Sequence, residues 1–162
     1  MKISKPLFWN NKNLISLSLI PFSIITFIIN FFKNFLLKKN YKIKTICVGN
    51  IYVGGTGKTS LSIEINNILK KKFKTVFIKK KYINQLDERE LLKINGSVFS
   101  DNDRKMSLIK AENTRKFNLA ILDDGLQDKT IKYDLRFVCF NNINWIGNGM
   151  RIPAGPLRES IQ

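Results

Sequence analysis

The sequence predicts an α/β fold in which a mainly parallel sheet is flanked by helices and preceded by an N-terminal membrane-associated helix. Three observations support this prediction. Short apolar runs alternate with segments of helical spacing. One apolar run enters a glycine-rich turn that opens into a helical pattern. A long uncharged stretch near the N-terminus has the composition of a helix in contact with lipid.

The uncharged N-terminal stretch runs from Leu14 to Phe32, between Lys12 and Lys33. On a helix its polar residues fall within a stripe of roughly 80° and leave a wide face of Leu, Ile and Phe. The stripe consists of Ser16, Ser23, Thr26, Asn30 and Asn34. Such a helix can lie in the membrane interface with its lysines at the head groups, and a true span or a helix buried within the protein are the alternatives. Pro21 is expected to kink this helix or to mark a helix start.

The next elements are a strand, a glycine-rich loop and a helix. The apolar run Lys44-Thr45-Ile46-Cys47-Val48 predicts the strand, and Ser60 to Lys71 predicts the helix, since Leu61, Ile65, Ile68 and Leu69 share one face. Between them stands Gly54-Gly55-Thr56-Gly57-Lys58-Thr59. This order is typical of the phosphate-binding loop of P-loop nucleotide triphosphatases, so the predicted ligand is ATP.

The residue types of the loop fit phosphate binding. Glycines let the backbone approach phosphates closely, and a helix N-terminus offers free N–H groups and a positive dipole end. Lys58 is expected to hold the β- and γ-phosphates, and the Thr59 hydroxyl to bind Mg²⁺. Tyr52 stands where the usual pattern has its first glycine. A plain glycine turn between strand and helix is the alternative.

The rest of the chain alternates in the same way. It predicts a strand at Thr75 to Ile78, a short helix at Asp87 to Lys93, a short strand at Gly96 to Phe99, a helix at Arg104 to Asn113, and a buried strand at Leu135 to Phe140.

A further apolar run, Asn118 to Leu122, leads directly into Asp123-Asp124-Gly125. In a doubly wound sheet the carboxyl ends of the strands line the ligand crevice. A carboxylate there can hold the Mg²⁺ that bridges the phosphates, and we expect Asp123 and Asp124 to do so. An Asp-Asp-Gly turn without such a role is the alternative.

The composition narrows the range of functions. The 162 residues suffice for one domain with a sizeable core, and 28 basic against 12 acidic residues leave a net charge of +16. Such a charge suits an acidic partner, but abundant Lys, Ile and Asn are also typical of A+T-rich coding sequence. Cys47 and Cys139 lie in apolar runs and are expected to be buried thiols in a reducing compartment. The absence of histidine excludes a His-based triad and a histidine zinc site, and no aromatic-basic motif predicts nucleic-acid binding.

Together these features resemble one family, the tetraacyldisaccharide 4′-kinases, which phosphorylate the lipid A precursor at the inner face of the bacterial inner membrane. The resemblance covers nearly the whole chain. Its motifs are Pro6-Leu7-Phe8-Trp9, Val48-Gly49-Asn50 with Val53 to Thr59, Asp123-Asp124-Gly125-Leu126-Gln127, and Gly147-Asn148-Gly149 followed by Pro153-Ala154-Gly155-Pro156-Leu157-Arg158-Glu159. The last of these strings is the most specific. The family's loop is similar in lacking the glycine that Tyr52 replaces.

The resemblance implies roles for individual residues. The residues that it assigns to ATP binding are Tyr52, Val53, Gly54, Gly55, Thr56, Gly57, Lys58 and Thr59. Asp123 and Asp124 would serve the metal with Thr59, while Arg158 and Glu159 match active-site positions. Asp87 would lie near the sugar hydroxyl, where a carboxylate can accept the proton as the hydroxyl attacks the γ-phosphate. The residues alone favour a solvated helix start for Asp87.

The chain departs from the family pattern at three places. Lys79-Lys80-Lys81-Tyr82 stands where the family has Ser-Arg-Gly-Tyr, and Asp128 stands where it has histidine. The family's chains also continue into a second α/β lobe, whereas this sequence stops at Gln162. A partial sequence, a split gene and a decayed enzyme all fit that stop, and we expect little turnover without the second lobe.

The sequence thus suggests a membrane-associated region over residues 1–39 and a nucleotide-binding lobe over residues 40–162. The implied function is ATP- and Mg²⁺-dependent phosphorylation of the 4′-hydroxyl of tetraacyldisaccharide 1-phosphate at the cytoplasmic face of the inner membrane. The expected partners are the lipid A precursor, the membrane surface and a C-terminal lobe, without nucleic acid. A membrane-attached ATPase or switch protein, and an inactive nucleotide-binding remnant, are the alternative functions.

Overall fold

The computed structural model describes residues 5–82, 85–143 and 145–159. The chain divides into two compact units. Unit 1 comprises Met1–Leu36, Ile51–Thr56 and Phe140–Gln162, and unit 2 comprises Leu37–Asn50 and Gly57–Cys139. The expected boundary after residue 39 lies close to the first change of unit, but unit 1 also includes two later segments.

Unit 2 contains a parallel sheet of five strands in the part of the chain that the structure describes. The strands are β1 (Lys44–Gly49), β2 (Thr75–Lys80), β3 (Val98–Asp101), β4 (Leu119–Asp123) and β5 (Leu135–Val138). Their order in the sheet is β3-β2-β4-β1-β5, and all the pairings are parallel. The apolar runs that predicted strands therefore form one sheet, and the predicted α/β class is confirmed.

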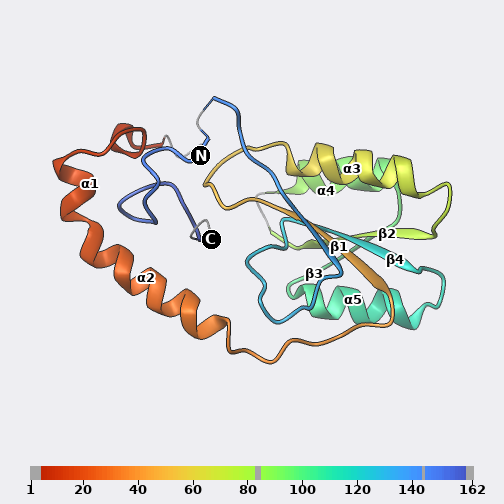
Figure 1. The fold of residues 1–162 in the computed structure, drawn as a ribbon. Coiled ribbons are helices and arrows are strands. Elements are labelled where there is room, and N and C mark those ends of the chain that lie inside the picture. The colour runs from red at the N-terminus through yellow and green to blue at the C-terminus, as the bar shows by residue number, and fades with distance from the viewer. Residues whose placement is uncertain (1–4, 83–84, 144, 160–162) are drawn as a thin grey trace. The chain divides into compact units, whose positions relative to one another are not determined.

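Among the described residues, three helices cover the sheet of unit 2. Helices α3 (Lys58–Leu69) and α4 (Leu86–Asn95) lie over one face, and α5 (Arg104–Asn113) lies over the other (Figure 1). The core joins the inner strands to the apolar sides of α3 and α4, and it includes Ile46, Val48, Ile65, Phe77, Leu92, Leu119 and Ile121. One residue of the expected buried face of α3 differs, because Ile68 is exposed.

The last strand is shorter and more exposed than the sequence suggested. We expected a buried strand from Leu135 to Phe140, but β5 ends at Val138 and its residues are exposed. The reason is its place at the edge of the described sheet, where it pairs with β1.

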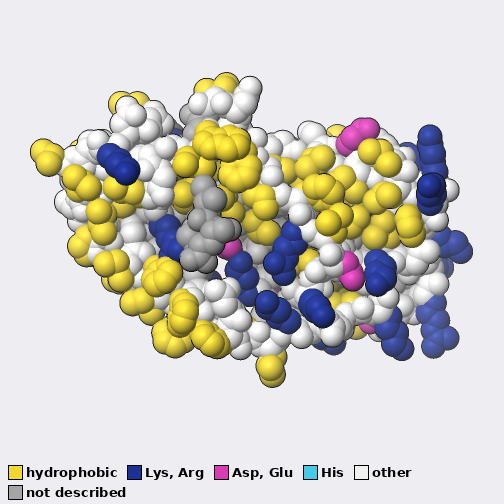
Figure 2. All heavy atoms as spheres, in the orientation of Figure 1, with side chains coloured by type: hydrophobic (Ala, Val, Ile, Leu, Met, Phe, Trp, Pro, Cys, Tyr) yellow, Lys and Arg dark blue, Asp and Glu magenta, His cyan; other side chains and the backbone are white. Residues whose placement is uncertain are grey.

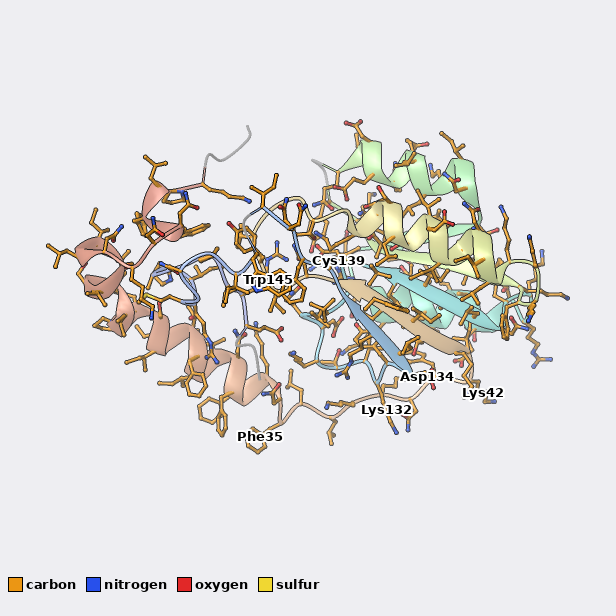
Figure 3. The ribbon with its side chains drawn as sticks, turned by 45° about the horizontal axis from the view of Figure 1, so that its top comes forward. Phe35, Lys42, Lys132, Asp134, Cys139 and Trp145 are labelled. Atoms are coloured by element: carbon orange, nitrogen blue, oxygen red, sulfur yellow. The ribbon has the colours of Figure 1, made fainter. Side chains whose placement is uncertain are left out.

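Polar contacts hold the beginning of β5 against β1. The backbone N–H and the hydroxyl of Thr45 donate to the Asp134 carboxylate over 2.8 and 3.0 Å. Figure 3 shows Asp134 and Cys139 at opposite ends of this strand. Cys139 and Cys47 are both buried free thiols, as predicted.

The first described elements of unit 1 are a short 3-10 helix (Leu7–Trp9) and two α-helices, α1 (Leu14–Ser18) and α2 (Ile20–Lys33). Asn13 caps α1 through a reciprocal pair of hydrogen bonds with Ser16. Pro21 lies in the first turn of α2, where its missing N–H costs no helical hydrogen bond. The expectation that Pro21 marks a helix start is therefore confirmed.

The polar stripe of the N-terminal segment binds another part of unit 1. Ser23, Thr26 and Asn30 donate hydrogen bonds to the carbonyls of Arg151, Ile152 and Arg158 over 2.9, 2.9 and 3.0 Å, respectively. The Ser23 hydroxyl also accepts from the Ala154 N–H. The central residues of the stripe thus form hydrogen bonds with backbone groups of the C-terminal loop. They do so in place of contacts with lipid head groups.

The opposite side of α2 is apolar and exposed. Ile24, Ile25, Ile28, Ile29 and Phe32 are all about half exposed or more. Figure 2 shows hydrophobic side chains gathered over α1 and α2. Among the described residues, no helix has both the length and the hydropathy needed to cross a bilayer.

Candidate functional site

The candidate site in unit 2 lies at the carboxyl ends of β1, β2 and β4. Strand register places Asp123 of β4 beside Val48 of β1 on one side and beside Lys79 of β2 on the other. The carboxyl ends of neighbouring parallel strands meet at one edge of a sheet. The chain leaves β1 at this edge and enters the glycine-rich loop. The pairing of β1 with β4 therefore brings Asp123 and Asp124 close to the helix that follows the loop.

Helix α3 begins directly after the last glycine of the loop, as a phosphate-binding helix N-terminus requires. Gly57 is its N-cap residue with φ of 72°, a left-handed conformation that favours glycine. Lys58 is the first helical residue, and its ammonium lies 3.7 Å from the Asp124 carboxylate, both side chains being mostly buried. The backbone of Asp124 is fixed by hydrogen bonds from its N–H to the Val48 carbonyl and from Arg104 to its own carbonyl.

Asp123 is bound by two further polar residues of α3. Its carboxylate is fully buried and accepts hydrogen bonds from the Thr59 hydroxyl at 3.1 Å and from the Ser62 hydroxyl at 3.4 Å. The structure thus brings together four residues that the sequence singled out, as the pairs Lys58 with Asp124 and Thr59 with Asp123.

A residue that sequence reasoning missed completes this cluster. The Lys79 ammonium lies 2.6 Å from Asp123 and also forms an ion pair with Glu88 of α4. Burial lowers the pKa of Lys79, but the charges and hydrogen bonds of Asp123 and Glu88 together outweigh that effect, so its pKa is raised and the lysine stays charged. The sequence shows Lys79 only as the first of three lysines, and the strand register is what distinguishes it.

Asp87, the expected general base, lies in the first turn of α4, with its side chain exposed. Among the described residues, none forms an ion pair or hydrogen bond with its carboxylate. The neighbouring Glu88 is bound to Lys79, and that ion pair connects the start of α4 to the ends of β2 and β4. The ion pair between Lys79 and Glu88 therefore fixes the first turn of α4, which includes Asp87, without binding the Asp87 carboxylate itself.

The remaining loop residues belong to unit 1, because the chain changes unit between Thr56 and Gly57. The segment before Thr56 pairs with the C-terminal loop: the Val53 N–H donates to the Pro156 carbonyl and the Arg158 N–H to the Ile51 carbonyl, over 3.0 and 2.7 Å. The ring of Tyr52 is buried and lies under the Lys5 ammonium. These contacts place Arg158 and Glu159 beside the first part of the loop.

The C-terminal motifs, which include the most specific part of the family resemblance, also have a structural role. The buried Asn148 side chain donates to the carbonyls of Ala154 and Phe8 and accepts from the Met150 N–H. The Trp9 indole donates to the Pro153 carbonyl. The motifs near residues 6–9, 147–149 and 153–158 thus form one hydrogen-bonded cluster within unit 1.

Comparison with known proteins gives a consistent result. The family model LpxK, described as tetraacyldisaccharide-1-P 4′-kinase, matches residues 12–162. A tetraacyldisaccharide 4′-kinase of Pelagibacter ubique is 55% identical and covers 99% of this chain and 52% of the relative. One from Rickettsia bellii is 32% identical over 98% of this chain and 55% of the relative. The chain spans about half the length of these curated relatives.

A solved structure has the same fold. The crystal structure of LpxK from Aquifex aeolicus in complex with ATP aligns with a TM-score of 0.73 at 25% identity, covering 90% of this chain and 55% of that one. None of these similarities favours an unrelated membrane-attached ATPase or switch protein. With the family model matching nearly the whole chain, the protein belongs to the tetraacyldisaccharide 4′-kinase family.

Proposed function

We propose that this chain is the nucleotide-binding lobe of a tetraacyldisaccharide 4′-kinase, which transfers the γ-phosphoryl group of ATP to the 4′-hydroxyl of tetraacyldisaccharide 1-phosphate. The observation that supports it best is the arrangement of Lys58, Thr59, Asp123 and Asp124 at the carboxyl ends of β1 and β4. Family membership supplies the substrate class.

ATP binding follows from the first turn of α3. A helix N-terminus with a preceding left-handed glycine presents backbone N–H groups and a positive dipole end to phosphate. Lys58 adds a positive charge that Asp124 holds in place at 3.7 Å. The similar protein from Aquifex aeolicus was solved in complex with ATP, in agreement with this role.

The Mg²⁺ that we expect with ATP fits some of the predicted ligands. The Thr59 hydroxyl donates its hydrogen to Asp123, so its oxygen still has a lone pair for a metal. Asp124 is 18% exposed and can be reached, whereas Asp123 is enclosed by its donors. Thr59 and Asp124 would hold the ion, which would neutralise charge on the transferring phosphoryl group.

For phosphoryl transfer we propose Asp87 as the general base. Its carboxylate would take the proton of the 4′-hydroxyl as that oxygen bonds to the γ-phosphorus, while the bond from phosphorus to the β–γ bridging oxygen breaks and ADP leaves. Arg158 and Glu159 match active-site positions of the family, and Arg158 would stabilise phosphoryl charge. We also propose that a C-terminal lobe completes the enclosure of ATP.

The exposed apolar side of α2 supports a membrane surface as the second partner, at the cytoplasmic face of the inner membrane. The Ser23, Thr26 and Asn30 side chains face the C-terminal loop, which leaves the isoleucines and phenylalanines free to enter an interface. Lys12 and Lys33 flank the helix and would meet lipid phosphates.

Nucleotide binding is tested by titration calorimetry of the whole chain with ATP and MgCl₂. Lys58→Ala should abolish binding, because it removes the charge at the phosphates. Lys70→Ala is the matched control, since the exposed Lys70 caps the other end of α3 and its ammonium bonds only to the Asn67 side chain. Equal ATP affinity in Lys58→Ala and the native chain would refute the assignment of the loop.

Phosphoryl transfer is tested with labelled ATP and the lipid substrate on thin-layer plates, after a C-terminal lobe from a relative is supplied by fusion. Asp87→Asn should lower turnover far more than it changes ATP affinity, because the base acts only as the proton leaves. No lipid phosphorylation by the completed protein would count against the kinase. Full activity of residues 1–162 alone would show that no second lobe is needed.

The membrane partner is tested by sedimentation with anionic vesicles. Glutamates at Ile24 and Ile28 should release the protein, because each places a charge on the apolar side of α2. Glutamates at Ile68 and Ile94 serve as the control, since both are exposed isoleucines on helices of unit 2. Equal vesicle binding by the two double variants would exclude α2 as the attachment site.

A further inference from the structure

The Lys79 side chain occupies the place where the sequence led us to expect a metal contact. Lys79 and Asp123 are directly opposite each other in the β2–β4 pairing, and their side chains are 2% and 0% exposed. Neighbouring residues in register project to the same side of a parallel sheet, so the lysine meets the carboxylate without leaving its strand. The 2.6 Å distance between the charged groups follows from this register.

The Asp123 carboxylate is surrounded by three donors from the protein. Its Oδ2 accepts from the Lys79 ammonium and the Thr59 hydroxyl, and its Oδ1 accepts from the Ser62 hydroxyl at 3.4 Å. Mg²⁺ requires oxygen ligands at about 2.0–2.1 Å in near-octahedral geometry and keeps several waters. A fully buried carboxylate with these three donors lacks room for such an ion, so Asp123 does not fit a direct metal ligand.

The lysine is also held from its other side. Glu88, in the first turn of α4, forms a second ion pair with the Lys79 ammonium. Because carboxylates lie on both sides of the Lys79 ammonium, we expect it to keep this position when a nucleotide binds. Across the part of the chain that the structure describes, no three acidic or cysteine side chains come together as metal ligands.

We propose that the Lys79 ammonium is a built-in counter-cation for Asp123, and that nucleotide binding by this chain therefore depends only weakly on a divalent ion. The proposal rests on the proposed function, because it takes ATP as the ligand of α3. Lys79 acts through Asp123 and the Thr59 hydroxyl, and so is a positioning residue. It neutralises the Asp123 carboxylate at the phosphate end of the sheet whether or not Mg²⁺ is present.

The test measures the ATP dissociation constant of the whole chain by calorimetry, once with excess MgCl₂ and once with excess EDTA. The native chain should show a ratio below about threefold. Lys79→Met keeps the side-chain volume and removes the charge, and Asp123 then becomes available to the ion, so the ratio should rise to about tenfold or more. Lys79→Arg keeps the charge and should retain the native ratio.

A control variant and the native chain show whether a change in the ratio of ATP dissociation constants is specific to Lys79. Lys110→Met removes a lysine from an exposed ion pair with Asp101 and should leave the ratio unchanged. If Lys79→Met fails to fold, as loss of a buried charge partner can cause, the native chain still decides, because a ratio of about tenfold or more there would overturn the proposal. Absence of ATP binding in both buffers would refute the proposed function and this proposal together.

Discussion

The hydrogen bonds between α2 and the C-terminal loop lead to a quantitative prediction. The triple variant Ser23→Ala, Thr26→Val, Asn30→Leu keeps side chains of similar size or shape and removes four hydrogen bonds to the backbone of residues 151–158. A typical intramolecular hydrogen bond contributes about 0.5–1.5 kcal/mol. The four are not additive, and the new apolar groups recover part of the loss, so we expect unit 1 to lose about 3 kcal/mol.

Tryptophan fluorescence makes the measurement specific for unit 1. The chain has two tryptophans, Trp9 and Trp145, and both belong to that unit. Trp9 bonds to the Pro153 carbonyl, and Trp145 stacks on Phe140 with 4.9 Å between ring centroids. Urea unfolding followed at these two residues should therefore show a lower midpoint in the triple variant.

Ser18→Ala is the matched control for this experiment, because the Ser18 hydroxyl is exposed and bonds only to the Ile15 carbonyl of its own helix. It should change the free energy of unfolding by less than about 0.5 kcal/mol. If the stripe faced lipid head groups instead of the loop, the triple variant would unfold like the control. That result would refute the docking of α2 on residues 151–158.

Two further predictions concern titratable groups of unit 2. Burial raises the pKa of Asp134, but hydrogen bonds from Thr45 and the charge of Lys44 outweigh it and leave the pKa below its ordinary value of 3.8. A carboxylate whose pKa is lowered by folding stabilises the fold above its unfolded-state pKa, and this stabilisation is lost as the pH falls through its folded-state pKa. Asp134→Asn should therefore reduce the fall in the urea midpoint between about pH 7 and pH 3. An unchanged fall would contradict this role of Asp134. Burial raises the pKa of the Cys47 thiol to about 12, so a thiol reagent at neutral pH should label Cys47 only after denaturation, and rapid labelling of the native protein would contradict its burial.

The sequence was sufficient for the order and type of the elements in unit 2. Apolar runs and helical spacing located β1, β2, β4 and α5 within about two residues, because these elements are framed by glycines, lysines and aspartates that end regular structure. The exposure of β5 could not be predicted in the same way. A run such as Leu135 to Phe140 has the same composition at an edge as in the centre, and only the strand order distinguishes the two positions.

The candidate site was predictable only where its residues share a local motif. Lys58 and Thr59 follow from the glycine loop, and Asp123 and Asp124 from the end of an apolar strand. Lys79 could not be recognised, because its importance depends on a register between strands that are 44 residues apart. The partners of the α2 stripe were hidden for a similar reason, since each lies 126 or 128 residues away in the chain.

That separation has a consequence for how the protein is made. Helix α2 leaves the ribosome early, but the backbone that its Ser23 and Thr26 side chains bind is synthesised 128 and 126 residues later. At about 5–20 residues per second, the delay is roughly 6 to 26 s. Throughout this interval the nascent helix exposes an apolar side and a polar side without its folded partner, whereas every segment of unit 2 has already been translated when residue 139 is added. We therefore expect the sheet to be complete before the N-terminal helices find their place, and a nascent chain to be most prone to aggregation or premature lipid contact through its first 36 residues.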